Sequence, residues 1–260
     1  MKALRIFLAL TVTLAILASL ASCGANPLED YNEAVNKTLK ESSYREIIKM
    51  SATAMVDSTI IRVGIESDLT CQGNTGSTYA ASGVGKATVS AMGDSETPYK
   101  LYVRDGIYYY DYENYFEDGS NYQYKLDGDF GDNEVITDLF SIRVDDLASA
   151  EVKKENGKTA IVMVVKDEKA VSLLNDTLSP MDMMLFGEAA VTITRKDLTI
   201  VTTLDGEGRV EQCTATVLGN AAYYGSYVSI VYVFDISYSE YGTAAEPTFP
   251  SDLAYYPSAY

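Results

Sequence analysis

Hydrophobic and polar residues alternate along most of this chain, at the two-residue period of a half-buried β-strand. The first alternating stretch places Met50, Ala52 and Ala54 on one face, and the next stretch does the same for Ile61, Val63 and Ile65. Further strands are predicted over residues 77–91, 188–204, 209–218 and 227–238. The pattern therefore predicts a sheet with one apolar face.

Short turns are predicted to join three pairs of strands into hairpins. Asp105-Gly106 separates residues 101–104 from 107–110, Asn156-Gly157 separates 151–154 from 159–162, and residues 205–208 precede the strand at 209–218. Asp-Gly and Asn-Gly pairs favour the left-handed backbone that two-residue hairpin turns require. The sheet is therefore predicted to be antiparallel. The strand at 77–91 is rich in Gly, Ala and Ser, which indicates a bent sheet or a ligand close to the backbone.

Helical periodicity interrupts the strands in three places. A first helix is predicted from Asn26-Pro27 to about Ser42, with Asn26 and Glu29 in capping positions. A second helix is predicted over residues 134–147, and a third over 167–180 that stops at Pro180. The apolar run after Pro180 contains Met181, Met184 and Phe186, and it is either core or the adaptable wall of a pocket.

The first 22 residues have the features of a secretory leader. Two basic residues precede an apolar stretch over residues 6–20, which is shorter than the roughly 20 residues of a membrane-spanning helix. Residues 20–23 (Leu-Ala-Ser-Cys) resemble the bacterial lipobox, in which the cysteine receives a diacylglycerol thioether before cleavage. The resemblance implies a lipid on Cys23 that holds the protein on the outer face of a bacterial membrane. The alternative is an ordinary leader with an incidental cysteine.

The predicted organisation follows from this leader. Residues 1–22 are the leader, residues 23–27 are the lipidated cysteine with a short tether, residues 28–255 form a single domain, and residues 256–260 are a tail. The mature chain of 238 residues is within the range of one all-β domain. The body begins close to the membrane surface.

Composition excludes several classes of function. The net charge is −17, and it becomes −19 when Lys2 and Arg5 leave with the leader. This acidity argues against nucleic-acid binding, which needs clustered Lys and Arg. The chain has no histidine, so Ser-His and Cys-His nucleophile pairs and imidazole ligands are excluded. No catalytic residue and no cofactor is predicted, and the protein is predicted not to be an enzyme, although carboxylate-pair or Ser-Lys chemistry stays open.

The remaining cysteines and acidic residues leave alternatives. Cys71 and Cys213 either form a disulfide in the oxidising extracytoplasmic space or are free and buried. The acidic segment 127–134 resembles a calcium loop in part, but Gly131 and Asp132 break the EF-hand spacing. A solvated acidic loop is predicted there, and no metal site.

Tyrosine is unusually frequent in this chain. There are 21 tyrosines, nine of them between Tyr99 and Tyr124. In an alternating strand, Tyr108, Tyr110 and Tyr112 share one face. They form either an interaction surface for a protein or a glycan, because tyrosine combines apolar area with a hydrogen-bonding tip, or part of a half-buried sheet in which aromatic residues simply fit.

The layout resembles a known superfamily. A lipobox, one amphipathic helix, a meander of long strands and a Pro-rich end follow each other, with local similarity at residues 49–51, 99–112 and 246–253. Over most of residues 28–253 the chain resembles the lipoprotein carriers and the mycobacterial LppX-like lipoproteins. The resemblance implies a half-barrel that carries acyl chains or lipids. The acidic charge, the tyrosines and the lipid anchor differ from the dedicated lipoprotein shuttle, so its partner chemistry is not carried over.

The predicted fold is α+β: a strongly curved antiparallel β-sheet, a half-barrel, with a few helices covering the concave side. The predicted function is binding of a hydrophobic or amphiphilic ligand between sheet and helices. The predicted ligand-binding residues are Met50, Ala52, Ala54, Ile61, Val63, Ile65, Met181, Met184 and Phe186. The alternative is a cell-surface interaction module that docks a protein or wall glycan through Tyr108, Tyr110 and Tyr112.

Overall fold

The computed structural model describes most of the predicted domain. It covers residues 26–56, 59–73, 78–90, 93–127, 147–155, 157–165, 175–187, 191–223 and 225–259. The predicted leader with Cys23, residues 134–146 of the second predicted helix, residues 167–174 of the third, and all but the first residue of the acidic segment 127–134 lie outside these residues.

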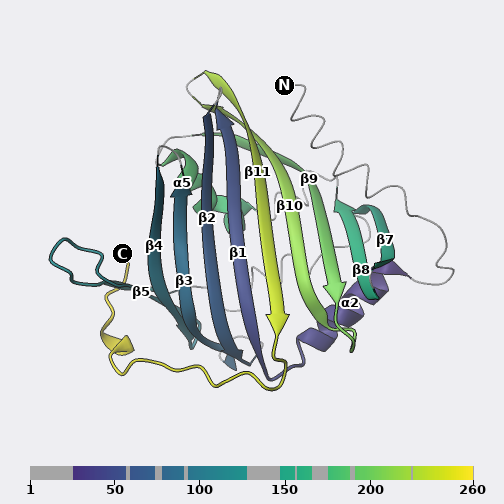
Figure 1. Cartoon of the computed structure of the whole chain (residues 1–260), viewed down its shortest axis with the longest axis horizontal. Helices are drawn as coiled ribbons and strands as arrows, with labels where there is room; N and C mark the ends of the chain where they lie inside the picture. The colour runs from purple at the N-terminus through teal and green to yellow at the C-terminus, as the bar shows by residue number, and fades with distance from the viewer. Residues whose placement is uncertain are drawn as a thin grey trace.

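Across the described residues, one open antiparallel sheet of eleven strands dominates the fold (Figure 1). Its spatial order is β6-β5-β4-β3-β2-β1-β11-β10-β9-β8-β7, so the pairing of β1 with β11 joins the two halves of the chain and the sheet is not closed. The strands are β1 (Ser43–Val56), β2 (Thr59–Gln72), β3 (Ala80–Ser90), β4 (Asp94–Arg104), β5 (Ile107–Tyr112), β6 (Tyr122–Asp127), β7 (Leu147–Glu155), β8 (Lys158–Val165), β9 (Ile193–Leu204), β10 (Val210–Tyr223) and β11 (Ser226–Ser239).

The three predicted hairpins are confirmed. Asp105 and Gly106 join β4 to β5 with φ values of 55° and 76°, the left-handed backbone that this turn needs. The other two hairpins join β7 to β8 and β9 to β10. The sequence did not predict β6, which has only six residues. Tyr122 and Tyr124 alternate on one side of it, but this pattern is too short to distinguish a strand from a connection.

The first helix, α2 (Pro27–Thr38), begins where the sequence predicts, but the capping differs. The Asn26 side chain makes no capping hydrogen bond; its carbonyl accepts one from the Asp30 amide at 3.0 Å. The helix ends earlier than predicted, at Thr38, whose hydroxyl accepts a hydrogen bond from the Val210 amide at 2.9 Å. This contact fixes the end of α2 to the start of β10.

The prediction that a helix stops at Pro180 is wrong. The helix α5 (Asn175–Phe186) continues through this proline and includes the apolar run that follows it. Pro180 lies in the second turn, close enough to the helix start that it removes one backbone hydrogen bond while the apolar side chains after it still pack on the sheet. Within the described residues, no helix has the length and apolar character needed to cross a membrane.

Both helices pack on one face of the sheet, here called the inner face. Helix α2 lies against β7, β8 and β10, and α5 lies against β1 and β2; Figure 1 shows α5 behind the sheet. In the strand predicted over residues 227–238, every second residue faces inward and is buried: Val228, Ile230, Tyr232, Phe234 and Ile236. The described residues thus confirm the large antiparallel sheet of the predicted fold and contain two α-helices beside it, while the half-barrel with helices over its concave side stays a prediction.

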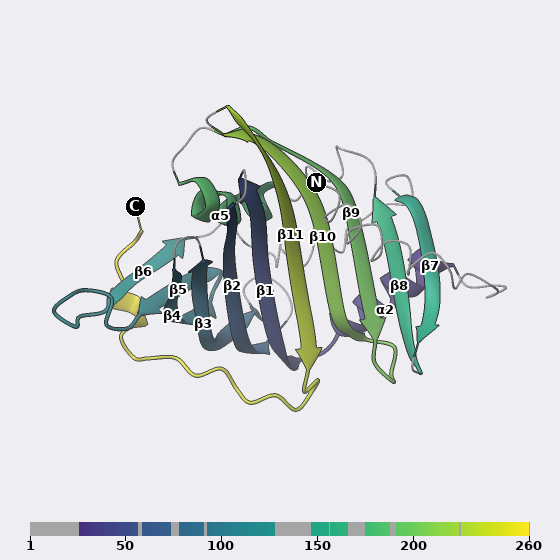
Figure 2. The same cartoon turned by 45° about the horizontal axis from the view of Figure 1, so that its top comes forward.

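The Pro-rich end of the chain, after Gly242, is loop-like apart from a short 3-10 helix (Leu253–Tyr255). Figure 2 shows this segment reaching the β4–β6 end of the sheet. There the Tyr256 ring lies 5.9 Å from the Tyr109 ring, between centroids, and the Lys125 amide donates to the Pro257 carbonyl at 2.8 Å. The segment therefore covers part of the outer face and pairs with the edge strand β6.

Candidate ligand-binding face

The six strand residues predicted to bind a ligand lie together on the inner face. Between β1 and β2 they form the cross-strand pairs Met50 with Ile65, Ala52 with Val63, and Ala54 with Ile61. The register with β11 places Phe234, Tyr232 and Ile230 beside the same β1 residues. Ala52, Ala54 and Val63 are buried, whereas Met50, Ile61 and Ile65 are half-buried.

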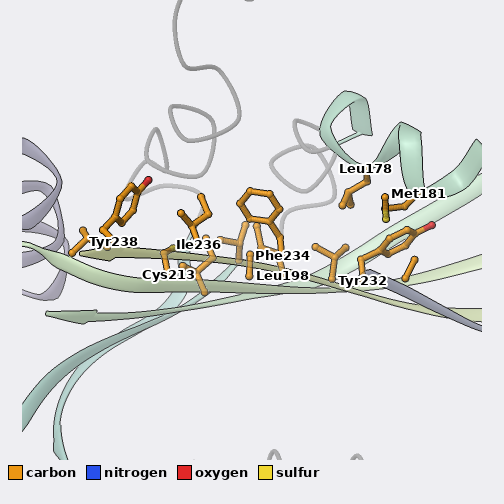
Figure 3. Close-up of a cluster of buried hydrophobic side chains, with 14 of the residues drawn as sticks. Leu178, Met181, Leu198, Cys213, Tyr232, Phe234, Ile236 and Tyr238 are labelled. Atoms are coloured by element: carbon orange, nitrogen blue, oxygen red, sulfur yellow. The ribbon is translucent and has the colours of Figure 1, made fainter. Parts of the chain in front are cut away.

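Helix α5 brings the predicted methionine-rich wall to the same place. Met181 and Phe186 are buried, Met184 is half-buried, and Met183 is 63% exposed on the opposite side of the helix. Figure 3 shows Leu178 and Met181 projecting from α5 on the side where Tyr232 and Phe234 leave the sheet. The fold therefore joins the two predicted parts of the site, although their role in ligand binding stays a prediction.

Three polar residues connect α5 to the sheet. Asp182 of α5 accepts a hydrogen bond from the Tyr232 hydroxyl at 2.6 Å and an ion-paired hydrogen bond from Arg195 of β9. The Arg195 guanidinium carbon also lies 5.1 Å from the centroid of the Tyr232 ring. Burial, with the neighbouring Asp182 carboxylate, raises the pKa of Tyr232. This set is called the Asp182 cluster, and it places a neutralised charge pair within an apolar face.

A second polar group lies further along the inner face. Glu46 of β1 is 1% exposed, and its Oε2 atom accepts hydrogen bonds from the Tyr79 hydroxyl at 3.5 Å and from the Cys71 thiol at 3.8 Å. Across the β1–β11 pair, Glu46 is opposite Tyr238. Burial raises the pKa of Glu46 to about 7, and the hydroxyls of Tyr238 and Tyr79 and the thiol of Cys71 counter part of that shift.

The small residues of β3 leave room for a side chain of the protein itself. A Cβ atom on Gly85 would lie 2.4 Å from Cζ of Tyr99, so only glycine leaves space for this ring. The Tyr99 hydroxyl lies 2.8 Å from Ser67 Oγ and donates to the Glu66 carbonyl at 3.2 Å. Burial raises the pKa of Tyr99 to about 12. The sequence analysis attributed the small residues of this strand to a bent sheet or to a ligand close to the backbone. At Gly85 the group close to the backbone is the Tyr99 ring.

The predicted tyrosine row continues from Tyr99 along the inner face. Tyr108, Tyr110 and Tyr112 do share one face, while Tyr109 points to the other, but the three are half-buried among other rings. The tyrosine cluster is defined as Tyr99, Tyr110, Tyr112, Tyr115, Phe116, Tyr122 and Tyr124, whose neighbouring ring centroids are as close as 5.1 Å. Its most exposed rings are Tyr115 (54%), Phe116 (48%) and Tyr122 (39%), at the β5–β6 connection.

The disulfide considered between Cys71 and Cys213 is not formed. Both cysteines are free and buried, as in the alternative interpretation. Cys71 lies on β2 and Cys213 on β10, with β1 and β11 between them. Three strand spacings amount to about 14 Å, whereas the Cα atoms of a disulfide lie roughly 4.4–6.8 Å apart. Burial raises the pKa of Cys213 to about 11, which makes this thiol unreactive.

The sequence did not single out Glu46, Asp182 or Arg195. Glu46 carried a usable signal, because it occupies an inward position in the alternation that continues through Ile48 and Met50. A charged residue at such a position is unusual unless it is paired or functional. Asp182 and Arg195 carried no such signal, since 13 residues separate them in the sequence and only the fold brings the Asp182 carboxylate beside the Arg195 guanidinium.

Comparison with known proteins leaves the family of this chain unassigned. No family model matches the sequence, and a search of curated proteins finds no match. Solved structures give low-scoring alignments. The beta domain of the Bordetella autotransporter BrkA has 10% identity and a TM-score of 0.28, covering 76% of this chain and 100% of that one. A putative outer membrane lipoprotein-sorting protein domain from Vibrio parahaemolyticus has 11% identity and a TM-score of 0.19, covering 82% and 94%. Because the TM-scores are below 0.5, these likenesses assign neither a fold family nor a function.

Proposed function

We propose that this protein is a non-catalytic lipoprotein, held by lipid on Cys23 at the outer face of a bacterial cell membrane, that binds a hydrophobic or amphiphilic ligand. The ligand lies between the sheet and the helices of a half-barrel. The observation that carries the proposal is the position of α5, whose methionine-rich side faces the apolar pairs of β1 and β2. Methionine is unbranched and adapts to ligands of different shape.

The energetics of this face favour an acyl chain. Half-buried apolar side chains on β1 and β2, such as Met50 and Ile65, retain surface that a ligand covers when it binds. Each Å² of apolar surface removed from water contributes about 25 cal/mol. A site close to the membrane also lets a lipid exchange with the bilayer, because the predicted tether before α2 is only a few residues long.

The mature chain with Cys23→Ser, purified without detergent, tests the proposal. We expect native mass spectrometry to detect a lipid-sized adduct that organic extraction releases, and we expect the delipidated protein to take up a fluorescent fatty acid or fatty amine. The Met184→Gln substitution should weaken uptake, because it places an amide on the half-buried side of α5. The matched control is Met183→Gln, on the exposed side of the same helix. Absence of both adduct and uptake would reject the carrier function.

A second candidate function is favoured by the exposed part of the tyrosine cluster. Tyr115, Phe116 and Tyr122 present ring surface at the β5–β6 connection, and such rings suit contacts with a protein or a wall glycan. In this case cosedimentation with purified cell wall should fall when Tyr115 and Phe116 are replaced by serine. Unchanged cosedimentation would reject this role.

A further inference from the structure

Glu46 is a buried carboxyl group with an incomplete set of partners. The hydrogen bonds that it accepts from Cys71 and Tyr79 both reach Oε2, and no described residue donates one to Oε1. The hydroxyl of Tyr238, opposite Glu46 on β11, is also buried; it lies near enough to lower the pKa of Glu46, but it makes no hydrogen bond of normal length and angle with any described residue. A buried polar atom without a partner costs roughly 1–3 kcal/mol. Two such atoms on facing residues indicate a place where a donor group binds between them.

The surroundings of Glu46 contain no compensating positive charge among the described residues. The titratable groups that face it are Tyr79 and Tyr238 and the thiol of Cys71, with Tyr44 beside them. The nearest charged side chain on its own strand, Arg45, alternates to the outer face and pairs with Asp68 there. A buried carboxylate is stable only when it is protonated or paired with a cation.

Aromatic rings around the carboxyl group favour an organic cation over a metal ion. The Tyr44 and Tyr238 rings meet edge to face with centroids 5.7 Å apart, and Tyr79 approaches Glu46 from the segment before β3. Tyrosine rings attract ammonium groups through cation–π interactions. Calcium requires about six to eight oxygen ligands, and no group of three or more Cys, Asp or Glu residues in the described part of the chain is arranged to hold a metal ion.

Glu46 also stands at one end of the candidate ligand-binding face. Every second residue of β1 faces inward, so Glu46 is followed by Ile48, Met50, Ala52 and Ala54 on the same side. At about 3.3 Å per residue this row is about 26 Å long. It offers a polar end and an apolar length, which matches the two parts of an amphiphile.

We propose that Glu46 receives the ammonium headgroup of an amphiphile, between the rings of Tyr44, Tyr79 and Tyr238, while the chain of the ligand lies along the inward row of β1. The proposal rests on the proposed carrier function and adds the class of headgroup. An anionic headgroup is disfavoured, because it would face both this carboxylate and a mature chain whose net charge, after loss of Lys2 and Arg5 from the total of −17, is −19.

Three probes of equal chain length test the headgroup: hexadecylamine, hexadecanol and hexadecanoic acid. The affinity of each probe is measured at pH 8 by competition with the fluorescent lipid bound to the mature Cys23→Ser chain. We expect the amine to bind at least about tenfold more tightly than the alcohol, and the acid to bind most weakly. Glu46→Gln should abolish the advantage of the amine and leave the affinity for the alcohol within about threefold. The matched control is Glu66→Gln, which changes the net charge equally but lies on the outer face of β2, beside Lys49.

The outcomes separate this inference from the carrier function. Equal binding of all three probes, or preference for the acid, overturns the ammonium site and leaves the carrier function intact. If none of the three probes binds, the carrier function itself is rejected.

If Glu46→Gln does not fold, the Cys23→Ser chain with Glu46 intact gives a second measurement. The advantage of the amine should shrink between pH 8 and pH 5.5, because Glu46 takes up a proton. Burial raises the pKa values of Cys71, Tyr79 and Tyr238, so these groups stay protonated throughout. An advantage that does not change with pH overturns the role of Glu46.

Discussion

Glu46 makes the stability of the fold depend on pH near neutrality. Burial raises the pKa of its carboxyl group from 4.5 to about 7. Between pH 4.5 and pH 7 the folded protein keeps a proton on Glu46 that the unfolded chain has released. The free energy of unfolding therefore falls as the pH rises from 4.5 through 7, and the contribution of this proton is fully present only below pH 4.5. A shift of this size corresponds to about 3 kcal/mol.

Replacing Glu46 by glutamine removes this titration and keeps the size of the side chain. We expect E46Q to have a free energy of unfolding higher than that of the unsubstituted protein at pH 8, by up to about 3 kcal/mol, and similar to it at pH 5. Urea unfolding at both pH values measures the difference. Glu117→Gln, at an exposed position of the β5–β6 connection, is the control and should change neither value. Equal effects of E46Q at pH 5 and pH 8 would contradict the assignment.

Gly83 is a second position where one residue decides the local structure. A Cβ atom there would lie 1.9 Å from the Asp68 carbonyl oxygen and 2.9 Å from Cα of Leu69, both of them backbone atoms of β2. Because backbone cannot rotate away, Gly83→Ala must displace β3 from β2, and we expect it to destabilise the protein by at least about 2 kcal/mol.

Thermal or urea unfolding of G83A against G206A checks this expectation. Gly206, in the β9–β10 hairpin, has no atom within 4 Å of an added Cβ, so its substitution should change stability by less than about 0.5 kcal/mol. Similar stabilities of the two variants would show that β2 and β3 can separate at no cost, against the close contact at Gly83.

The sequence predicted well which strand residues face inward, but it did not predict which residues of neighbouring strands lie opposite them. The alternation placed Met50, Ala52 and Ala54 on one face because the side-chain period of a strand is fixed by its backbone. It gave no information on which residue lies opposite Cys71 or Cys213, since that depends on strand order. The disulfide alternative was wrong for this reason.

Among the elements, α5 depends most on polar contacts. Asp182 connects it to both Arg195 and Tyr232, and the Arg195 side chain is only 6% exposed. Removing one partner of a largely buried ion pair leaves the other charge without its partner and costs more than the pair contributes. We expect Asp182→Ala to lower the free energy of unfolding by about 3 kcal/mol and to speed hydrogen exchange of the α5 amides.

An exposed ion pair provides the comparison. Lys86 and Glu96 lie 3.1 Å apart between Nζ and Oε2, with side chains 40% and 56% exposed, so Glu96→Ala should cost less than about 1 kcal/mol. Urea unfolding and hydrogen exchange of both variants distinguish the two cases. If D182A costs no more than E96A, the Asp182 cluster does not hold α5 on the sheet.

Element boundaries were predictable where a turn has specific chemistry. Asp105-Gly106 marked its hairpin because both residues must adopt positive φ. The prediction that the helix ends at Pro180 was wrong, because packing of Met181 and Phe186 on the sheet outweighs the loss of one helical hydrogen bond. Local propensity thus predicts hairpins better than it predicts helices whose stability comes from tertiary contacts.

The whole molecule is organised by a pairing that no local pattern contains. The first strand pairs with the last along Arg45 to Met55, which places the two edges of the sheet at β6 and β7 in the middle of the chain. An open sheet exposes backbone donors and acceptors at its edges, where another chain can add a strand. The C-terminal segment pairs with one of these edges, so it is expected to prevent association there.

Deletion of residues 246–260 tests this role. The deletion removes the two backbone hydrogen bonds of Lys125 with Pro257 and Ala259, at 2.8 and 3.0 Å, and the contact of Tyr256 with Tyr109. We expect the shortened protein to self-associate increasingly with concentration in sedimentation velocity, because β6 then presents an unpaired edge beside exposed rings. The full-length Tyr256→Ala variant loses the ring contact but keeps the backbone pairing, so it should sediment as the unsubstituted protein does. A deletion variant that sediments like the full-length chain over the same concentrations would show that β6 is protected by its own twist or side chains, and not by the C-terminal segment.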